Sequence, residues 1–539
     1  MLKTIDLFAG AGGLSFGFEM TGKFKVLAAA EINKNAQATY KKNIVKGKPT
    51  FTMINDINGY DFVELNEKLG GIDIVIGGPP CQGFSNANRQ KNHLISMNNS
   101  LVKEFFRAIK EIKPKAFVME NVSMLRSDTH RFYESISDNE EIDALIEAGF
   151  DIPKRLDSLF ITNEKFENID YTMIDNICLN RFLIPIEIFK LLNILYKNLS
   201  NERRVVRFLE KNRLGLIRRI TTFLDEDIDD SLKFRLQAIC DSLTNDYFEN
   251  ELNSIGYIVN LQKVIHTIQE IKNNGLIGKF EINGDSQLIF KVNSYSVIDY
   301  INAILGGEYS QIGSTVNAEW FGVPQTRRRY IVIGIRKDLY PNINPSLPGN
   351  PDTLNINTVE DAIMDLVSYE AGYEKDYKEI PYNSDDILSD YANIMRQGSK
   401  TVKNHITTKT SELVLKRFEA IKPGQNFHSL SENMKNTYTR PERTQNTIYL
   451  RLKLNEPSGT VVNVRKSMWI HPILNRGLTV REAARLQSFP DKFGFIGTKD
   501  SQFQQVGNAV PPLLAKAIAQ QILNYILKSQ NNIHQINNI

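Results

Sequence analysis

Cys81 is the residue of this sequence best suited to act as a nucleophile. It lies in a Pro-Pro-Cys-Gln turn after the apolar run 72–76, which predicts a buried strand closed by Gly77-Gly78. Sites in open α/β sheets form at the carboxyl ends of such strands. A lone cysteine is usually a small buried apolar side chain, but a rigid turn between prolines and glycines is a poor place to pack one. Nearby basic residues would lower the pKa of the thiol and favour the reactive thiolate.

A glycine-rich turn over residues 9–13 follows a short predicted strand, 3–8. Such a turn binds dinucleotides, binds adenosyl cofactors, or simply closes a tight strand–helix connection. Glu31 ends the second predicted strand, about 20 residues after the turn, where an acidic residue binds ribose hydroxyls in nucleotide-binding folds. The alternative is that Glu31 is simply a solvated carboxylate at the end of a strand. The strict GxGxxG pattern, a Walker lysine and a nearby phosphate-binding cation are missing from this part of the sequence. A nucleoside-type cofactor is therefore favoured over a pyrophosphate one.

Three further charged residues could take part in chemistry. Glu120 ends the fourth predicted strand, at the same sheet edge as Cys81, and a carboxyl group in a cleft can act as a proton donor. A surface carboxylate is its plain alternative. Arg327 and Arg329 precede another predicted strand, 330–335, and could stabilise an anionic intermediate or bind phosphate. Three successive arginines also commonly face solvent.

Strands and helices alternate over the first 120 residues, and these elements must position the candidate groups. The predicted strands are 3–8, 25–30, 72–76 and 115–119. One helix is predicted to begin at about residue 14, and two others to cover 33–43 and 101–112. This order predicts an α/β fold with a doubly wound, mostly parallel sheet. Near the C-terminus, helices are expected over 479–486 and 511–527.

The sequence changes character between residues 127 and 295. Candidate helices cover 186–199 and 202–220, and we find neither a catalytic constellation nor an internal repeat there. We expect the chain to divide into five parts: 1–126, 127–295, 296–340, 341–471 and 472–539. The second part is expected to be mostly helical and its role is unknown, and the last is expected to consist of helices.

Composition limits the class of protein. The chain has 539 residues, 42% of them hydrophobic and 24% charged, which is typical of a globular protein with two or three domains. Its cysteines, Cys81, Cys178 and Cys240, form neither a disulfide framework nor a metal-binding spacing, so we expect a reducing, cytoplasmic location and no metal. The sequence contains neither a signal peptide nor an apolar run of membrane-spanning length, so no membrane association is expected.

Positive charge is concentrated in one part of the chain. The whole sequence has 65 Lys and Arg against 62 Asp and Glu, a net charge of +3. Residues 396–470 contain 14 Lys and Arg against 5 Glu and no Asp, a net charge of +9. A nucleic-acid surface would have to come from such local segregation, although a solvated basic face is the alternative.

Taken in order, six sequence blocks closely resemble the cytosine-carbon-5 DNA methyltransferases of bacterial restriction-modification systems. They are DLFAGAGG (6–13), GGPPCQGFS (77–85), ENV (120–122), GVPQTRRR (322–329), LTVREAARLQSFPD (478–491) and QVGNAVPP (505–512). The resemblance implies a Rossmann-like methyltransferase fold. It also implies a site-specific enzyme that flips a cytosine out of duplex DNA.

The resemblance assigns catalytic roles to four residues. The Cys81 thiolate would add to ring carbon 6, and Glu120 would bind the exocyclic amine and ring nitrogen 3. Arg329, with Arg327 behind it, would hold the base carbonyl and the loop geometry. Ring carbon 5 would then take a methyl group from S-adenosylmethionine.

The resemblance also assigns the cofactor pocket. Glu31 would bind the ribose hydroxyls, Asp56 and Ile57 the adenine edge, and Leu101 would pack at the methionine end. The remaining cofactor-binding residues implied are Phe8, Ala9, Gly10, Gly12, Gly13, Pro79, Asn508, Ala509 and Val510. The chain departs from the family at Ile32, where an aromatic residue often follows the ribose-binding Glu, and in the long gap from Val122 to Gln325.

Target recognition in this family lies between the QxRxR and LTVREAARLQ motifs, which corresponds here to 341–471 and includes the basic segment. The resemblance further implies that 1–126 and 296–340 are two parts of the catalytic domain, that 127–295 is inserted between them, and that the helices of 472–539 complete that domain. The implied partner is double-stranded DNA, bound by a monomer, with a cognate restriction endonuclease or other defence protein as a further partner. Two alternatives stay open: a tRNA cytosine methyltransferase, and a non-catalytic DNA-binding protein on the same fold.

Overall fold

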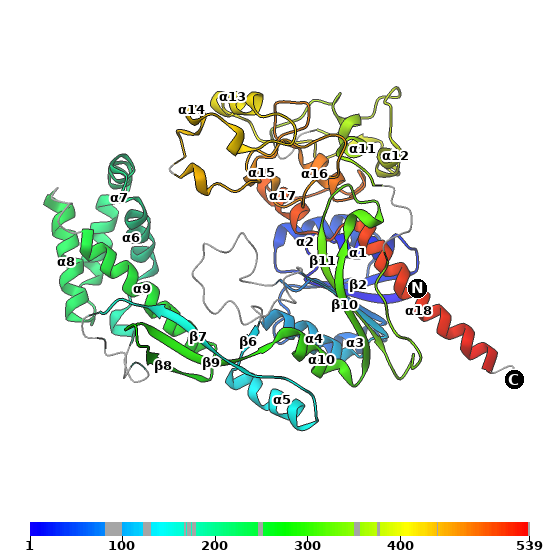
Figure 1. Cartoon of the computed structure of the whole chain (residues 1–539), viewed down its shortest axis with the longest axis horizontal. Helices are drawn as coiled ribbons and strands as arrows, with labels where there is room; N and C mark the ends of the chain where they lie inside the picture. The colour runs from blue at the N-terminus through cyan, green and yellow to red at the C-terminus, as the bar shows by residue number, and fades with distance from the viewer. Residues whose placement is uncertain are drawn as a thin grey trace. The chain divides into compact units, whose positions relative to one another are not determined.

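A computed structural model describes residues 1–80, 100–121, 131–166, 169, 174, 179–245, 252–349, 356–374, 378–438 and 440–536. The chain forms two compact units, shown in Figure 1. The first consists of Met1–Cys81, Ser100–Ser127 and Ile304–Ile539, and the second of Gln82–Asn99 and Asp128–Ala303. Among the helices that the structure describes, none has both the length and the apolar composition needed to cross a membrane.

The first unit is built on a seven-stranded sheet with the order β10-β11-β5-β4-β1-β2-β3. The pairs from β3 through β5 are parallel, whereas β11 runs antiparallel between β5 and β10. The predicted doubly wound, mostly parallel α/β sheet is therefore confirmed. The strands are β1 (Leu2–Leu7), β2 (Phe24–Ala30), β3 (Thr52–Ile54), β4 (Ile74–Gly77), β5 (Ala116–Asn121), β10 (Tyr309–Asn317) and β11 (Arg328–Arg336).

Helices pack against this sheet, and one contact joins the two ends of the chain. Figure 1 shows α1 (Gly13–Glu19) beside the C-terminal helix α18 (Pro512–Ile536). A Cβ at Gly17 would come within 2.4 Å of the Ala515 Cβ, so this close approach requires glycine. The other helices near the sheet are α2 (Lys34–Tyr40), α3 (Phe62–Lys68) and α4 (Ser100–Ile112).

Several helix boundaries differ from the sequence prediction, as α7 (Glu202–Phe223) does by ending at Phe223 and not at 220. The helix expected over 33–43 ends at Tyr40 and continues as a π-helical turn, Lys41–Val45. The helix expected over 511–527 runs on to Ile536. Apolar periodicity locates a helix better than it locates its ends, because terminal turns depend on tertiary contacts.

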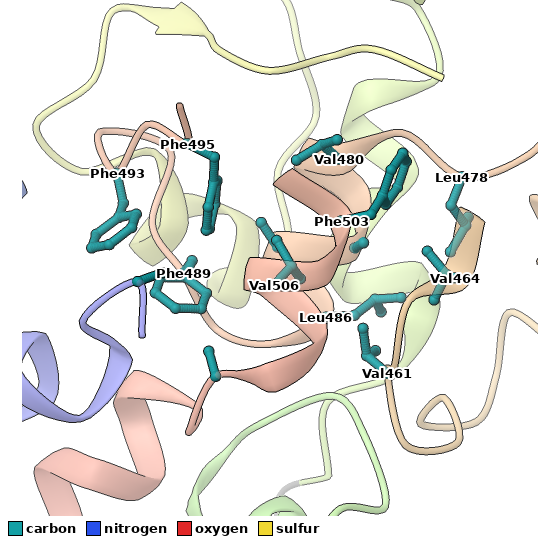
Figure 2. Close-up of a cluster of buried hydrophobic side chains, with 14 of the residues drawn as sticks. Val461, Val464, Leu478, Val480, Leu486, Phe489, Phe493, Phe495, Phe503 and Val506 are labelled. Atoms are coloured by element: carbon teal, nitrogen blue, oxygen red, sulfur yellow. The ribbon is translucent and has the colours of Figure 1, made fainter. Parts of the chain in front are cut away.

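The rest of the first unit has short helices and a large apolar core. Figure 2 shows part of this core, where Phe489, Phe493 and Phe495 lie against side chains of α16 and α17. The helices are α11 (Val359–Ile363), α12 (Asp390–Arg396), α13 (Glu412–Ala420), α14 (Glu432–Lys435), α15 (Val464–Ser467), α16 (Val480–Leu486) and α17 (Lys499–Asn508). Thr479 caps α16 in a capping box with Glu482, which explains why the LTVREAARLQ motif begins its helix at that point.

The second unit combines helices with an antiparallel sheet. Four helices, α6 (Ile186–Asn198), α7 (Glu202–Phe223), α8 (Asp230–Asn245) and α9 (Leu252–Asn273), surround an apolar core that includes Leu192, Leu216, Leu236 and Ile258. Helix α5 (Ile136–Glu147) precedes them and α10 (Val297–Gly306) follows. The sheet is β6 (Arg131–Tyr133), β7 (Arg155–Thr162), β8 (Gly278–Ile282) and β9 (Leu288–Ser296), with every pair made by β9. The sequence predicted helices in this segment but not its four-stranded sheet.

Candidate functional site

The glycine-rich turn joins the carboxyl end of β1 to α1, and its backbone explains its composition. Gly10 and Gly12 have φ of 55° and 95°, in the left-handed region that glycine enters without steric cost. A Cβ at Gly12 would meet the Tyr40 ring at 2.9 Å, whereas one at Gly10 would meet no atom within 4 Å. The turn thus packs against the protein at Gly12 and leaves room for a ligand beside Gly10.

Phe8 opens the same turn with a φ of 62°, which is a strained conformation for a bulky side chain. The next residue, Ala9, is buried, and its N–H donates to the carbonyl of Ala30 at the end of β2. Strained backbone of this kind persists where surrounding structure enforces it, and it concentrates at ligand-binding sites.

The Glu31 carboxylate lies directly beside this turn. The backbone N–H of Gly10 donates to Oε2 at 2.8 Å, and the N–H of Asn33 donates to Oε1 at 2.6 Å. Each carboxylate oxygen therefore has one fixed donor and a further lone pair, and the side chain is only half-buried. Such a carboxylate can accept hydrogen bonds from two adjacent hydroxyl groups.

The loops after β2 and β3 are tied together by Gln37. Its side-chain amide donates to the backbone carbonyl of Glu31 and, at 2.9 Å, to the side-chain oxygen of Asn55. The next residue, Asp56, is exposed and accepts from the N–H of Asn58, while Ile57 is buried. Glu31, Asp56 and Ile57 thus belong to one linked pair of strand-end loops.

The segment after α17 closes against the glycine turn. A Cβ at Gly13 would lie 2.3 Å from the carbonyl oxygen of Val510 and 3.3 Å from the Ala509 Cβ. Asn508, the last residue of α17, is exposed, and its Oδ1 accepts from Gln504. Residues separated by almost 500 positions therefore meet at the start of α1.

Glu120 and Arg329 form an ion pair at the neighbouring strand ends. Arg329 Nε lies 2.7 Å from Glu120 Oε1, and both side chains are mostly buried. A Cβ at Gly78 would come within 3.0 Å of Glu120 Oε2, so this carboxylate sits over the turn that follows β4. In that turn, the Pro79 carbonyl accepts from the Asn121 side chain at 3.2 Å.

Two predicted site residues are less well placed by the structure. Cys81 lies outside the described residues, two positions beyond Pro79. Leu101 is half-buried in the first turn of α4. The structure thus gathers the glycine turn, Glu31, Glu120 and Arg329 at one edge of the sheet, formed by the carboxyl ends of the parallel strands and the amino end of β11.

Arg327 is fully buried beneath this edge. Its guanidinium donates to the carbonyls of Val461 at 2.9 Å and Gly507 at 3.1 Å. Burial lowers the pKa of Arg327, and the nearby Arg329 lowers it further. Arg327 therefore joins the strand β11 to two distant segments, which is a positioning role.

Gln325 was overlooked as a functional residue by sequence reasoning, although it belongs to the GVPQTRRR motif. Its amide donates to Gln487 Oε1 at 2.6 Å and to the Leu486 carbonyl at 2.9 Å, and its oxygen accepts from the Val461 N–H. It is completely buried. Gln325 thus connects the end of α16 to Val461, which lies near the end of the basic segment.

Asp6 is a second overlooked residue, at the end of β1. The Ser15 hydroxyl donates to its carboxyl at 2.5 Å, and Ser15 shares a further hydrogen bond of 2.6 Å with Tyr40. Burial raises the pKa of Asp6 to about 7, and the charge of Glu31 adds to this shift. The hydrogen bonds fix α1 and α2 relative to β1, and so shape the turn between them.

The basic segment 396–470 divides into buried and exposed cations. Arg396 pairs with Asp365 and Asp386, while Arg417 and Arg451 donate mainly to backbone carbonyls and the hydroxyls of Thr437 and Tyr449. These three buried arginines hold the fold and are unavailable to phosphate. Exposed cations without an ion pair among the described residues are Lys400, Lys409, Lys416, Lys422, Arg440, Arg443 and Lys466.

Comparison with known proteins identifies relatives of this arrangement. The family model described as C-5 cytosine-specific DNA methylase matches residues 2–156 and 293–524. The type II methyltransferase M.DdeI of Desulfomicrobium norvegicum is 27% identical over 564 residues, covering 99% of this chain and 91% of that protein. The DNA (cytosine-5-)-methyltransferase M.ApeKI of Aeropyrum pernix is 26% identical, covering 96% of this chain and 98% of that protein.

A solved structure shares the fold. The crystal structure of a prophage-encoded E. coli protein, assigned as a DNA modification methyltransferase, superposes with a TM-score of 0.52 at 20% identity. It covers 98% of this chain and 99% of that chain.

The family match includes all six motif blocks and leaves out residues 157–292, which lie within the second compact unit. It takes in well over half of the chain. The resemblance predicted from the motifs is confirmed: the chain belongs to the family of C-5 cytosine-specific DNA methylases.

Proposed function

We propose that this enzyme transfers a methyl group from S-adenosylmethionine to carbon 5 of cytosine in duplex DNA. The observation that carries the proposal is the Glu120–Arg329 ion pair beside the turn leading to Cys81. It places a carboxyl group with a fixed cation at the same strand-end edge as the glycine-rich turn. One edge thus offers both a nucleoside site and an acid–base group.

The residues around the glycine turn fit an adenosyl cofactor. Gly10 faces open space, and Glu31 presents a carboxylate that can accept from both ribose hydroxyls. Asp56 and Ile57 would meet the adenine, and Asn508, Ala509 and Val510 would close the pocket. When bound, S-adenosylmethionine supplies an electrophilic methyl group on a positively charged sulfur.

The protein groups would activate the cytosine. The Cys81 thiolate adds to ring carbon 6, so the electrons of the 5,6 double bond become available at carbon 5, and a proton at ring nitrogen 3 is shared with Glu120. Arg329 holds Glu120 in place and would face the base carbonyl. After methylation, a solvent water would take the carbon-5 proton, the electrons of that C–H bond would re-form the 5,6 double bond, and the sulfur would leave carbon 6 as the Cys81 thiolate.

The relatives named as type II methyltransferases suggest a biological setting. We propose that the enzyme modifies one DNA site and thereby protects it in a restriction-modification or related defence system. A cognate endonuclease would be the partner protein.

The test is transfer of tritiated methyl groups to unmodified genomic DNA and, separately, to tRNA. We expect label in DNA, present as 5-methylcytosine, and its loss in Cys81→Ser, because a serine hydroxyl is far less ionised than a thiol. The serine variant should still bind S-adenosylmethionine. Label in tRNA alone, or normal turnover by the serine variant, would contradict the proposal.

A further inference from the structure

The second unit contains a strongly cationic helix. Helix α7 (Glu202–Phe223) has seven Lys and Arg against two Glu, a net charge of +5. The other three helices of the bundle, α6, α8 and α9, have net charges of +1, 0 and +1. The charge of the bundle is therefore concentrated on α7.

Five of the seven cations of α7 share one face. Its core side is formed by Phe208, Leu216 and Ile220. Five exposed cations lie opposite, within an arc of about 100° around the helix axis. They are Arg203, Arg204, Arg207, Lys211 and Arg218, and we call them the α7 basic face. Leu214 lies among them and is 81% exposed.

The α7 basic face lacks internal partners. Within the described part of the chain, none of its five side chains forms an ion pair with a carboxylate. Some other cations of this unit do so, as the exposed Arg155 does with Asp157 and the half-buried Lys291 with Glu281. Its charges are therefore available to an external anion.

The arrangement also works against the stability of the helix. Arg203, Arg207 and Lys211 follow one another at i, i+4 spacing, where like charges repel. Arg203 and Arg204 lie in the first turn, where the helix dipole disfavours cations. This clustering of cations lowers the stability of α7, and no ion pair within the described part of the fold offsets the loss. Such a pattern indicates a functional role.

We infer that the α7 basic face binds the phosphate backbone of duplex DNA, in addition to the target-recognition region. The inference rests on the proposed function, since DNA is the polyanion that this enzyme handles. From Arg203 to Arg218 the face is about 22 Å long, which corresponds to roughly six base pairs at ~3.4 Å per pair. Long, flexible Lys and Arg side chains are suited to phosphate contacts, which do not depend on the DNA sequence.

The test compares two triple variants of the full chain. The first is Arg207→Gln, Lys211→Gln and Arg218→Gln. The matched control changes three exposed cations of the same unit that lie on other elements, Lys190→Gln, Lys233→Gln and Lys279→Gln. Affinity for a mixed-sequence duplex of about 30 base pairs is measured between roughly 50 and 200 mM salt, the range in which counterion release changes affinity steeply.

We expect the α7 variant to bind DNA roughly tenfold or more weakly, with a log–log salt slope reduced by about 2 to 3, since each phosphate that is no longer neutralised removes ~0.9. The control variant should keep the wild-type slope. Affinity for S-adenosylmethionine should not change in either variant. Because glutamine removes charge repulsion along α7, the urea midpoint of the α7 variant should not fall. The single variant Lys211→Glu is a second test, which changes the charge of the face by less than the triple variant does.

Two results would overturn the inference. One is a wild-type salt slope in both the α7 triple variant and Lys211→Glu, while methyl transfer to DNA proceeds; the proposed function would then stand without this surface. The other is preferential binding of tRNA that disappears in the same variant, which would assign the face to RNA. Failure of the wild type to methylate DNA would instead overturn the proposed function.

Discussion

Arg329 Nε lies 2.7 Å from Glu120 Oε1, so two residues separated by more than 200 positions meet at the ends of adjacent antiparallel strands. The insertion of the second unit falls between them in sequence. The pairing of β5 with β11 fixes the two side chains relative to each other. The chain can therefore accept a large insertion between Glu120 and Arg329 without loss of their geometry.

The ion pair predicts a specific kinetic effect. Arg329→Gln leaves the mostly buried Glu120 without its cation, so we expect the single-turnover rate of methyl transfer to fall by about 10²-fold, the usual scale for losing a positioned acid–base group. Arg328→Gln is the matched control, because Arg328 is exposed and adjacent. Equal rates for the two variants would show that the ion pair does not assist the reaction.

The contact between Gly13 and Val510 predicts a stability effect. Gly13→Ala forces a Cβ to within 2.3 Å of a backbone oxygen, so the C-terminal segment must move away from the glycine turn. We expect a loss of about 1–3 kcal/mol in urea unfolding, typical of overpacking, together with weaker S-adenosylmethionine binding by calorimetry. Gly307→Ala is the control, because a Cβ there meets no atom within 4 Å. Unchanged cofactor affinity in Gly13→Ala would separate this contact from the pocket.

The buried Asp6 predicts a pH dependence of stability. Its folded-state pKa is raised from 3.8 to about 7, so between these values the folded protein keeps a proton that the unfolded chain has released. The free energy of unfolding should therefore fall as pH rises from about 4 to 7, by at most about 1.4 kcal/mol per pH unit. Below pH 4 the contribution is fully present, and above pH 7 it is lost.

Urea unfolding of Asp6→Asn measures this contribution. The asparagine variant cannot ionise, so its unfolding free energy should decline less over the same pH range than that of the wild type. Asp56→Asn, which alters an exposed carboxylate of the same site, should follow the wild type. Parallel pH curves for wild type and Asp6→Asn would mean that Asp6 does not carry the effect.

Local patterns predicted most of what surrounds the glycine turn. Strand β4 is a continuous apolar run, β2 is interrupted only by Lys25, and the glycines that follow β1 mark a tight turn, so these elements could be predicted. The sheet of the second unit was not predicted, because β8 is short and largely exposed, and its alternating pattern covers only Lys279 to Ile282. Nor could the links of Gln325 to Gln487 and Val461 be predicted, since a buried amide chooses its partners through tertiary packing.

Charge counting also had a limit in the basic segment. The net charge of +9 treats all 14 cations alike, but Arg396, Arg417 and Arg451 are buried and serve the fold. Burial depends on which carbonyls and carboxylates the folded chain brings near, and composition does not contain that information. The surface available to DNA is thus smaller than the sequence suggested.

Variants of exposed and of buried cations in the basic segment should therefore have different effects, the first on DNA binding and the second on stability. Replacing Lys409, Lys416 and Lys422 by Gln removes exposed charges, so DNA binding should weaken and the log–log salt slope should fall by about 0.9 for each phosphate that is no longer neutralised. Urea unfolding should be unchanged. Arg451→Gln removes hydrogen bonds to several buried carbonyls, so we expect a lower unfolding free energy, by about 1–3 kcal/mol.

The combination of measurements separates phosphate binding from folding. Lys453→Gln serves as a control, because Lys453 is exposed but already paired with Glu456, and its replacement should change the slope less than the replacement of an unpaired lysine. If the triple variant keeps the wild-type slope, the exposed lysines do not meet DNA, because removing a cation that neutralises a phosphate must change the number of counterions released. The phosphate contacts of this segment would then have to come from Lys400, Arg440, Arg443 and Lys466, its remaining exposed cations without an ion pair among the described residues.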